Sequence, residues 1–328
     1  MFRHSLAGAL MLGLSACVAA AGQGRQGPAD FGAGTGKVEM KTLLHDGLTR
    51  EYGLYIPPGY RAGPLVLLLH GGGGTIENTL SRAHGEEWKA LADRHGFLLA
   101  VPQGAAEISG QREGYHWNDH RDGERDSTAD DTGFILMLMD LLGDEYAVDS
   151  QQVFVTGASN GGMMTYRLLS EYPERFAAGA AFIANLPTAT PGALRLGAPV
   201  PVMIVNGTDD PLMKWEGGNV GRRGIADTVL SARDTLAWWQ GRNGTGTDIA
   251  ARRSLPDRAP SDGCRLHVED YRRGGDVFVR FVTMEGGGHA PPALQPNSGR
   301  NSRLYRRLIG TTCHDASGAA LAWEFFNR

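Results

Sequence analysis

The stretch Gly157-Ala158-Ser159-Asn160-Gly161 follows an apolar run at 153–155 and precedes residues 163–169, whose spacing is helical. This pattern predicts a strand, a sharp turn and a helix, with the serine on the turn. A side chain at either glycine would collide with the neighbouring strand or helix. The helix N-terminus then points its free N–H groups towards the serine hydroxyl. Because the chain has 47 glycines, the pentapeptide alone is a weak signal, and the flanking strand and helix give it weight.

A carboxylate candidate follows a second apolar strand, at residues 201–205. That strand runs into Asn-Gly-Thr and then Asp209, Asp210 and Pro211. Functional groups of parallel sheets gather at the carboxyl ends of strands. A carboxylate at this place can hold a histidine in one tautomer and stabilise its imidazolium form. Either aspartate could instead be an ordinary turn residue; we prefer Asp210, partly on the family pattern described below.

A histidine candidate follows a third apolar strand, at residues 277–282. That strand leads into the glycine-rich residues 285–288 and then His289. The chain has 10 histidines, so a histidine in a loop is not informative by itself. The order serine, acid, histidine along the chain is that of the α/β-hydrolases, and His289 stands third in it. The histidines in no comparable context are interpreted as surface or packing residues: His45, His84, His95, His267 and His314.

Upstream, the apolar residues 65–69 end in His70 and four glycines, Gly71 to Gly74. In α/β-hydrolases a turn of this kind supplies one N–H group of an oxyanion hole, and the residue after the nucleophile supplies the other. We therefore expect the backbone N–H groups near Gly72 and at Asn160 to bind a developing oxyanion. His70 is expected to be structural in this turn.

Strands and helices alternate along the chain, which favours a mostly parallel sheet flanked by helices, the α/β-hydrolase fold. At least one of Trp238 and Trp239 is expected in the core. Two insertions, 105–130 and 290–312, are expected to shape a pocket. The second insertion carries four arginines, Arg300, Arg303, Arg306 and Arg307. These could bind an acidic substrate, but a solvated loop is the simpler interpretation. Strands are predicted at 38–45, 51–56, 65–69, 97–101, 153–156, 178–184, 201–206, 265–271 and 277–283, and helices at 79–95, 132–144, 161–171, 226–242 and 315–327.

From about Glu51 to Phe326, the chain resembles the esterases grouped with polyhydroxybutyrate depolymerases, near the feruloyl and acetyl xylan esterases. In that family the acid is the second residue after Gly-Thr, which implies Asp210. The family usually continues its histidine with Thr-Trp-Pro, whereas Ala-Pro-Pro follows His289 here, so the resemblance leaves the substrate preference open. Trp117 and Met163, in matching segments, are candidate pocket residues. The matching segments are 52–60, 70–74, 117–118, 130–135, 155–163, 207–212, 286–289 and 323–326.

The N-terminal residues have the pattern of an export signal. A short basic start is followed by apolar residues 6–16, too few to span a bilayer, and by Leu-Ser-Ala-Cys at 14–17, which resembles a bacterial lipobox. We expect a signal peptide at 1–16, lipidation of Cys17, a flexible Gly- and Ala-rich tether at 17–36 and one catalytic domain at 37–328. The protein would then be an exported lipoprotein of the outer membrane or periplasm. The alternative is ordinary cleavage among residues 19–21, giving a secreted protein.

The chain has 3 cysteines. If Cys17 is lipidated, Cys264 and Cys313 remain as a pair that an oxidising compartment would allow to bridge; otherwise they are two free cysteines. His116 and His120 stand four apart, but in a charged loop without a helical pattern, and we expect no metal site. The net charge of −4, mixed along the chain, gives no sign of nucleic-acid binding.

These observations predict a serine carboxylesterase that forms an acyl-enzyme at Ser159, with Asp210 and His289 completing the triad. No cofactor is expected. The substrate would be a small-molecule or oligomeric ester, and membrane contact would occur only through the lipid anchor. Two alternatives remain open: a serine peptidase of the same fold, and a catalytically inactive, surface-anchored binding protein on a hydrolase scaffold.

Overall fold

The computed structural model describes residues 34–106, 114–121, 129–190, 197–220, 227–296 and 303–328. The predicted signal peptide, Cys17 and the tether as far as residue 33 lie outside the described residues. The end of the predicted tether is bound to the domain. The Thr35 N–H group donates to Asp93 Oδ2 at 2.7 Å, and the Gly36 N–H group donates to the Tyr55 hydroxyl at 2.7 Å. The domain therefore includes at least Thr35 and Gly36 of the predicted tether.

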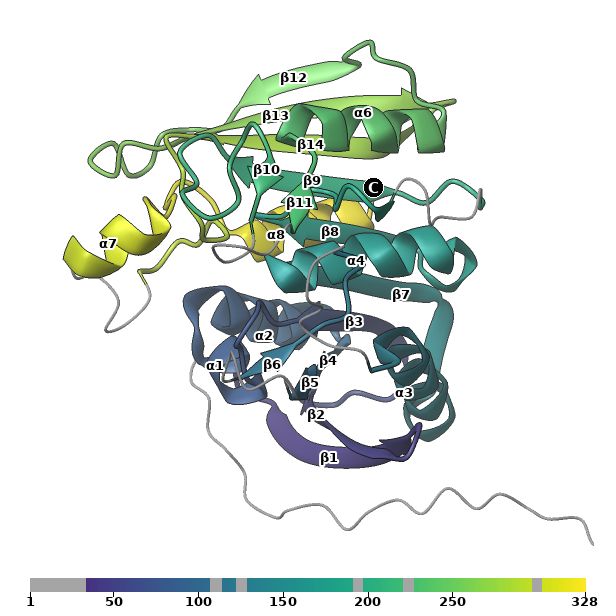
Figure 1. The fold of residues 1–328 in the computed structure, drawn as a ribbon. Helices are drawn as coiled ribbons and strands as arrows, with labels where there is room; N and C mark the ends of the chain where they lie inside the picture. The colour runs from purple at the N-terminus through teal and green to yellow at the C-terminus, as the bar shows by residue number, and fades with distance from the viewer. Residues whose placement is uncertain (1–33, 107–113, 122–128, 191–196, 221–226, 297–302) are drawn as a thin grey trace, which may run out of the picture.

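A ten-stranded sheet forms the centre of the described structure, in the order β1-β2-β4-β3-β7-β8-β9-β14-β13-β12 (Figure 1). Strands β4, β3, β7, β8, β9 and β14 run parallel, and antiparallel strands flank them at both edges. The predicted α/β-hydrolase fold is confirmed. The strands are β1 Lys37–His45, β2 Leu48–Ile56, β3 Gly63–Leu69, β4 Leu98–Pro102, β7 Val148–Ala158, β8 Ala178–Phe182, β9 Val202–Gly207, β12 Ala251–Ser254, β13 Arg265–Arg273 and β14 Asp276–Glu285, with short pairs β5 Ala105–Ala106 and β6 Tyr115–His116, and β10 Gly218–Asn219 and β11 Thr228–Val229.

Helices cover both faces of this sheet. Within β3, Leu65 and Leu67 belong to the apolar cluster that includes residues of α3, α4 and α6, and Val66 and Leu68 to the cluster that includes residues of α1, α2 and α8. This two-sided burial explains why the central strands are continuous apolar runs. Trp239 lies in the first cluster, as predicted for at least one of the two tryptophans. The helices are α1 Ile76–Ser81, α2 Ala83–His95, α3 Asp131–Tyr146, α4 Asn160–Glu171, the 3₁₀ turn η1 Pro173–Arg175, α6 Ala232–Asn243, α7 Arg303–Ile309 and α8 Gly318–Phe326.

Several predicted elements need correction. The helix predicted at 79–95 is two helices, α1 and α2, because Arg82 between them has extended backbone angles. The helix predicted at 226–242 begins only at Ala232, where Ser231 caps it, and β11 precedes it. Strand β12 was missed, since its sequence Ala-Arg-Arg-Ser has no apolar pattern. Helix α7 lies within the insertion at 290–312, which carries Arg306 and Arg307, both exposed; Arg300 lies outside the described residues.

Cys264 and Cys313 form a disulfide, with their Cα atoms 5.4 Å apart. Both cysteines are fully buried. The bond joins the start of β13 to the segment between α7 and α8. The two cysteines are 49 residues apart in the chain. Of the two alternatives for these cysteines, a disulfide and two free thiols, the disulfide is therefore correct.

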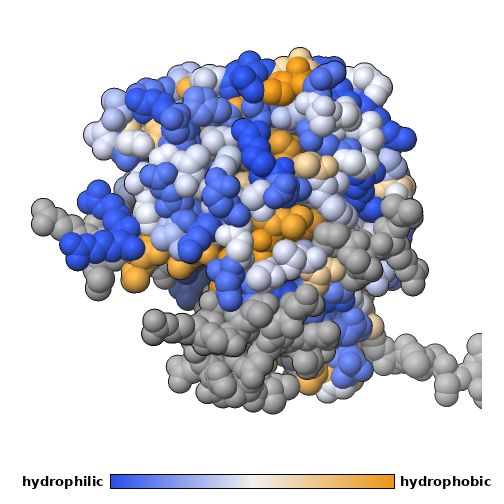
Figure 2. Space-filling view, turned by 45° about the horizontal axis from the view of Figure 1, so that its top comes forward, coloured by the Kyte–Doolittle hydropathy of each residue, from blue (hydrophilic) through white to orange (hydrophobic). Residues whose placement is uncertain are grey.

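The face in Figure 2 mixes hydrophilic side chains with several separate apolar patches, in keeping with charges spread along the chain. Among the described residues, no helix is both long and apolar enough to cross a membrane.

Candidate active site

Ser159 occupies a strained turn between β7 and α4. Its backbone angles are φ 57° and ψ −122°, outside the regions that non-glycine residues ordinarily adopt. The Ser159 N–H group donates to Phe182 O at 2.9 Å, and Ser159 O accepts from Met163 N at 2.9 Å in the first turn of α4. The turn therefore holds the serine at the helix N-terminus, as the pentapeptide predicts.

The two glycines of the pentapeptide lie where no side chain fits. A Cβ atom on Gly157 would lie 2.4 Å from Gly161 O. A Cβ atom on Gly161 would lie 2.5 Å from the carbonyl oxygens of both Leu69 and His70. These contacts are with backbone, which cannot move aside cheaply, so the close packing of β3, β7 and α4 requires glycine at both places.

Asp210 and His289 lie together beyond the ends of the neighbouring strands β9 and β14. His289 Nδ1 and Asp210 Oδ2 are 2.7 Å apart, and the aspartate side chain is fully buried. Asp210 Oδ1 accepts from the N–H groups of Leu212 at 2.8 Å and Met213 at 2.7 Å, so both carboxylate oxygens have donors. Asp209 is exposed and accepts instead from the Thr208 hydroxyl. The structure thus brings Asp210, the preferred aspartate, against His289.

The ends of β9 and β14 can approach because both carry glycine. A Cβ atom on Gly207 would lie 2.2 Å from Gly287 O. The Asp209 N–H group donates to Gly287 O at 3.0 Å, and the Gly286 N–H group donates to the Thr208 hydroxyl at 2.8 Å. The glycine-rich sequence before His289 therefore docks its loop onto the loop that carries the aspartate.

The glycine turn after β3 packs against the serine turn. Cβ atoms on Gly71 and Gly72 would lie 3.6 Å from Ser159 Cβ and 3.7 Å from Asn160 Cβ, respectively. The first N–H groups of a helix have no partner within it, and Asn160 is the first residue of α4. The backbone near Gly72 and at Asn160 thus borders the place where the serine hydroxyl would react.

His70 has the structural role expected of it. It is buried, its Nε2 accepts from the Gly104 N–H group at 2.9 Å, and its Nδ1 lies 2.8 Å from Gly71 O. These partners assign the hydrogen to Nδ1, which then donates to Gly71 O. Burial lowers the pKa of His70 to about 4, so the imidazole is neutral at neutral pH.

Trp117 was expected to line the pocket, and the structure places it behind the pocket wall instead. Its side chain is fully buried, its indole N–H donates to His70 O at 2.9 Å, and its ring centroid lies 4.8 Å from that of His70. Its backbone is bound on both sides by the side chain of Asn160. Trp117 therefore supports the glycine turn and does not contact the cavity.

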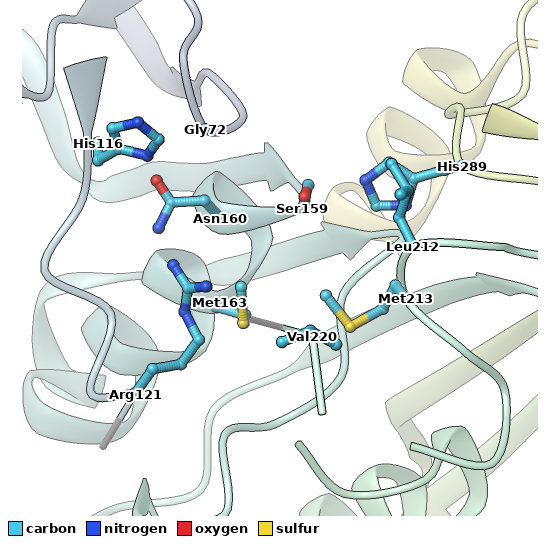
Figure 3. A pocket seen from close by; sticks show the side chains of 10 residues that line it. All are labelled: Gly72, His116, Arg121, Ser159, Asn160, Met163, Leu212, Met213, Val220 and His289. Atoms are coloured by element: carbon cyan, nitrogen blue, oxygen red, sulfur yellow. The ribbon is translucent and has the colours of Figure 1, made fainter. Parts of the chain in front are cut away.

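A cavity of about 170 Å³ opens beside Ser159 (Figure 3). In this view the serine lies between His289 on one side and Asn160 on the other, and Arg121 comes from the side opposite His289. Met163 lines the cavity, as expected. The other lining residues are Gly72, His116, Arg121, Ser159, Asn160, Leu212, Met213, Val220 and His289.

The sequence did not predict five of the lining residues: His116, Arg121, Leu212, Met213 and Val220. Arg121 Nε lies 2.9 Å from Asp119 Oδ1, and its Nη1 lies 3.4 Å from Asp227 Oδ2, so its charge is balanced. Met213 could have been predicted as a lining residue, because it comes three residues after the preferred aspartate. His116 and Arg121 could also have been predicted, because both lie in the first insertion, which was expected to shape the pocket.

The described residues give no support for a metal centre. They contain no group of three or more His, Cys, Asp or Glu side chains that could hold a metal ion. Of the two histidines weighed for this role, His120 bonds to Glu171 through Nε2, and His116 lies at the cavity.

Comparison with known proteins identifies the family. Residues 50–186 match the family described as esterase PHB depolymerase. A putative esterase, NocK, from Nocardia uniformis subsp. tsuyamanensis is 30% identical over 292 residues, which cover 85% of this chain and 79% of NocK. The chain belongs to the polyhydroxybutyrate depolymerase-like esterases. This family places it among the carboxylic ester hydrolases, as the sequence predicts.

Other relatives are longer than this chain. A poly(3-hydroxybutyrate) depolymerase from Ralstonia pickettii is 31% identical over 254 residues, which cover 72% of this chain and 49% of the depolymerase. A bifunctional acetylxylan esterase/xylanase, XynS20E, from Neocallimastix patriciarum is 29% identical over 249 residues, and the match covers 75% of this chain and 31% of that enzyme. The chain therefore spans half or less of these two esterase relatives. Among solved structures, an acetyl xylan esterase from Aspergillus awamori aligns with a TM-score of 0.49 and 17% identity, over 85% of this chain and 96% of that one.

Proposed function

We propose that this esterase hydrolyses carboxylic esters through an acyl-enzyme on Ser159, with His289 as general base and Asp210 as its orienting acid. The contact that supports this assignment is the 2.7 Å approach of His289 Nδ1 to Asp210 Oδ2, beside the cavity that Ser159 also lines. Because Asp210 Oδ2 accepts the Nδ1 hydrogen, Nε2 of a neutral His289 is left as the basic nitrogen, on the side of the ring away from the aspartate.

In the proposed reaction, Ser159 Oγ attacks the ester carbonyl carbon while His289 Nε2 takes the hydroxyl proton. The carbonyl oxygen gains negative charge, which the N–H groups near Gly72 and at Asn160 stabilise. Collapse of the tetrahedral intermediate breaks the ester C–O bond, and His289 returns its proton to the leaving alcohol. Water then repeats the steps on the acyl-enzyme and releases the carboxylic acid.

The cavity favours a small or extended ester group over a bulky one. Its volume of about 170 Å³ is below the range typical of pockets for drug-sized ligands. Met163, Met213 and Val220 supply an apolar wall, and His116 and Arg121 a polar one. We propose small-molecule or oligomeric esters as substrates, with the rest of an oligomer outside the cavity.

The deciding experiment combines labelling with turnover. A fluorophosphonate probe should label the wild-type protein on Ser159, and Ser159→Ala should abolish labelling and lower ester hydrolysis by about 10⁴-fold or more. A panel of short-chain, hydroxyalkanoate and feruloyl esters would give the acyl preference, and matched amides would identify a peptidase. A folded Ser159→Ala variant with near-normal ester hydrolysis would overturn the proposal. Absence of both labelling and hydrolysis in the wild type would favour an inactive binding protein.

We also propose that the protein is exported as a lipoprotein. Residues 14–17, Leu-Ser-Ala-Cys, after an apolar segment support cleavage before Cys17 and lipidation of its thiol. The buried disulfide fits this proposal, because such bonds persist in oxidising compartments. The proposed location is the outer membrane or periplasm, with secretion as the alternative.

A further inference from the structure

A segment far from His289 in sequence is bound directly to its backbone. Residues 309–314, here called the strap, consist of the last residue of α7 and the first residues of the segment that leads to α8. The Gly288 N–H group donates to Thr311 O at 2.7 Å, and the His289 N–H group donates to Ile309 O. A Cβ atom on Gly288 would lie 2.2 Å from Ile309 O, so the backbones of the strap and the His289 loop pack directly against each other, with no room for a side chain at Gly288.

The strap also contacts the loop of the orienting acid. Gly310 has φ 77°, and a Cβ atom there would lie 2.8 Å from Gly288 Cα and 3.3 Å from Asp209 O. The strap therefore packs against both loops whose ends meet in the contact between His289 and Asp210. A shift of the strap would change the relative placement of these two side chains.

The strap is bonded to Ala293 and, through two further connections, to the turn before β13. The first is the disulfide from Cys313, in the strap, to Cys264. The second is the carboxylate of Asp262: its Oδ1 accepts from the Cys264 N–H group at 2.8 Å, and its Oδ2 accepts from the His314 N–H group at 2.9 Å. One aspartate thus ties the backbone on both sides of the disulfide together.

The same turn touches the start of the His289 loop. A Cβ atom on Gly286 would lie 2.3 Å from Gly263 O, and one on Gly287 would lie 3.1 Å from Cys313 Sγ. The turn at 262–264, the strap and the residues 286–289 therefore form one packed unit.

We propose that Cys264, Cys313 and Asp262 are positioning residues for His289. They touch neither Ser159 nor the cavity, and they act by fixing the strap against the backbone of Gly288 and His289. This inference rests on the proposed role of His289 as the general base. Its consequence is that loss of the disulfide slows proton transfer while leaving the ester-binding surface intact, because misplacement of a catalytic group by about 1 Å can cost on the order of 10²-fold in rate.

The test measures kcat and KM separately on the full chain. In the double variant Cys264→Ala/Cys313→Ala we expect kcat to fall by about 10- to 100-fold and KM to change by less than about threefold. The rate of fluorophosphonate labelling should fall in parallel with kcat, because the same base activates Ser159. Circular dichroism at the assay temperature establishes that the compared proteins are folded. A disulfide that only stabilised the fold would leave kcat of the folded protein unchanged.

Asp262→Ala keeps the disulfide and removes both carboxylate hydrogen bonds, so it decides the question if the double variant does not fold. It should lower kcat by several-fold at unchanged KM. Asp93→Ala is its matched control, since Asp93 also accepts a backbone N–H group, from Thr35, at a place remote from the strap. Asp93→Ala should keep the wild-type kcat.

Two outcomes separate this inference from the proposed function. If a folded His289→Ala variant remains active, the role of His289 is wrong. If His289→Ala is inactive but kcat stays within twofold of wild type in Asp262→Ala and in the folded disulfide variant, the strap does not position His289 and the inference is overturned.

Discussion

Asn160 binds the backbone of Trp117 through both ends of its side-chain amide. The Trp117 N–H group donates to Asn160 Oδ1 at 2.8 Å, and Asn160 Nδ2 donates to Trp117 O at 3.1 Å. Nδ2 also donates to Asp119 Oδ2 at 2.6 Å. The residue next to the proposed nucleophile thereby fixes the segment that carries His116, whose ring packs against Gly72. Through the 116–119 segment, the Asn160 side chain is connected to the glycine turn that is expected to supply the other N–H group of the oxyanion hole.

Asn160→Ala should lower kcat by about 10- to 100-fold, although it keeps the backbone N–H group proposed for the oxyanion hole. The loss is expected because the 116–119 segment would no longer be tied to α4. Steady-state kinetics check this. Asn243→Ala is the matched control, because Asn243 makes the same pair of bonds to Val200, at 3.0 and 2.8 Å, away from the cavity. Equal kcat losses in the two variants would show that only general stability is affected.

Asp210→Asn should reduce kcat/KM by on the order of 10³- to 10⁴-fold, because an amide at this place no longer favours the required tautomer of His289 and cannot stabilise its charged form. Asp209→Asn should stay within about threefold of wild type, since Asp209 is exposed and contacts Thr208 rather than His289. Kinetics on one soluble ester suffice for this comparison. The reverse order of effects would make Asp209 the acid.

Much of the site could be predicted because its parts follow apolar strands that end at one edge of the sheet. Ser159, Asp210 and His289 each come directly after such a strand. The link between Asn160 and Trp117 could not be predicted, since it depends on how the residues between β4 and α3 fold back. For the same reason Trp117 was expected at the cavity and lies beneath the glycine turn.

Charged edge elements were also beyond the sequence pattern. Strand β12 pairs with β13, and its arginines are neutralised there, Arg252 by Glu269 at 2.7 Å and Arg253 by Asp270 at 3.4 Å. An apolar periodicity is not needed at an exposed edge, so the usual strand signal is absent. The break between α1 and α2 likewise could not be predicted, because the residue at the break is an arginine, Arg82, and not the proline or glycine that would mark a helix end.

Acid should destabilise the fold through His84. This residue is half-buried, its Nε2 accepts from the Trp88 indole N–H at 3.1 Å, and its ring lies edge-on to that of Phe182, with the ring centroids 4.9 Å apart. Desolvation of the imidazole lowers the pKa of His84 to about 3, from its ordinary value of 6.5. Between these values the unfolded chain binds more protons than the folded one, so the free energy of unfolding falls as the pH falls, by up to about 1.4 kcal/mol per pH unit.

Urea unfolding at pH 7.5 and pH 5 measures this contribution. Gln at position 84 can still accept the Trp88 hydrogen bond but does not titrate, so wild type should lose about 2 kcal/mol more than His84→Gln between the two pH values. His70, whose pKa is also lowered, is present in both proteins and cancels in the difference. Equal losses in the two proteins would show that His84 is not held neutral in the folded state.

Cys17→Ser should release the protein from the membrane without changing its kinetics on soluble esters. In sorting rules associated with lipoboxes, aspartate after the cysteine retains a lipoprotein at the inner membrane; Val18 gives no such signal, so we expect the outer membrane. Because Thr35 and Gly36 are bound to the domain, we take the expected tether to extend only as far as residue 33. At roughly 5–6 Å times the square root of its length, such a coil spans about 20 Å, enough to hold the domain clear of the bilayer.

Cell fractionation and labelling with a radioactive fatty acid check the anchor. A wholly soluble wild type whose N-terminus follows Ala20 or Ala21 would instead establish ordinary cleavage and a secreted or periplasmic esterase.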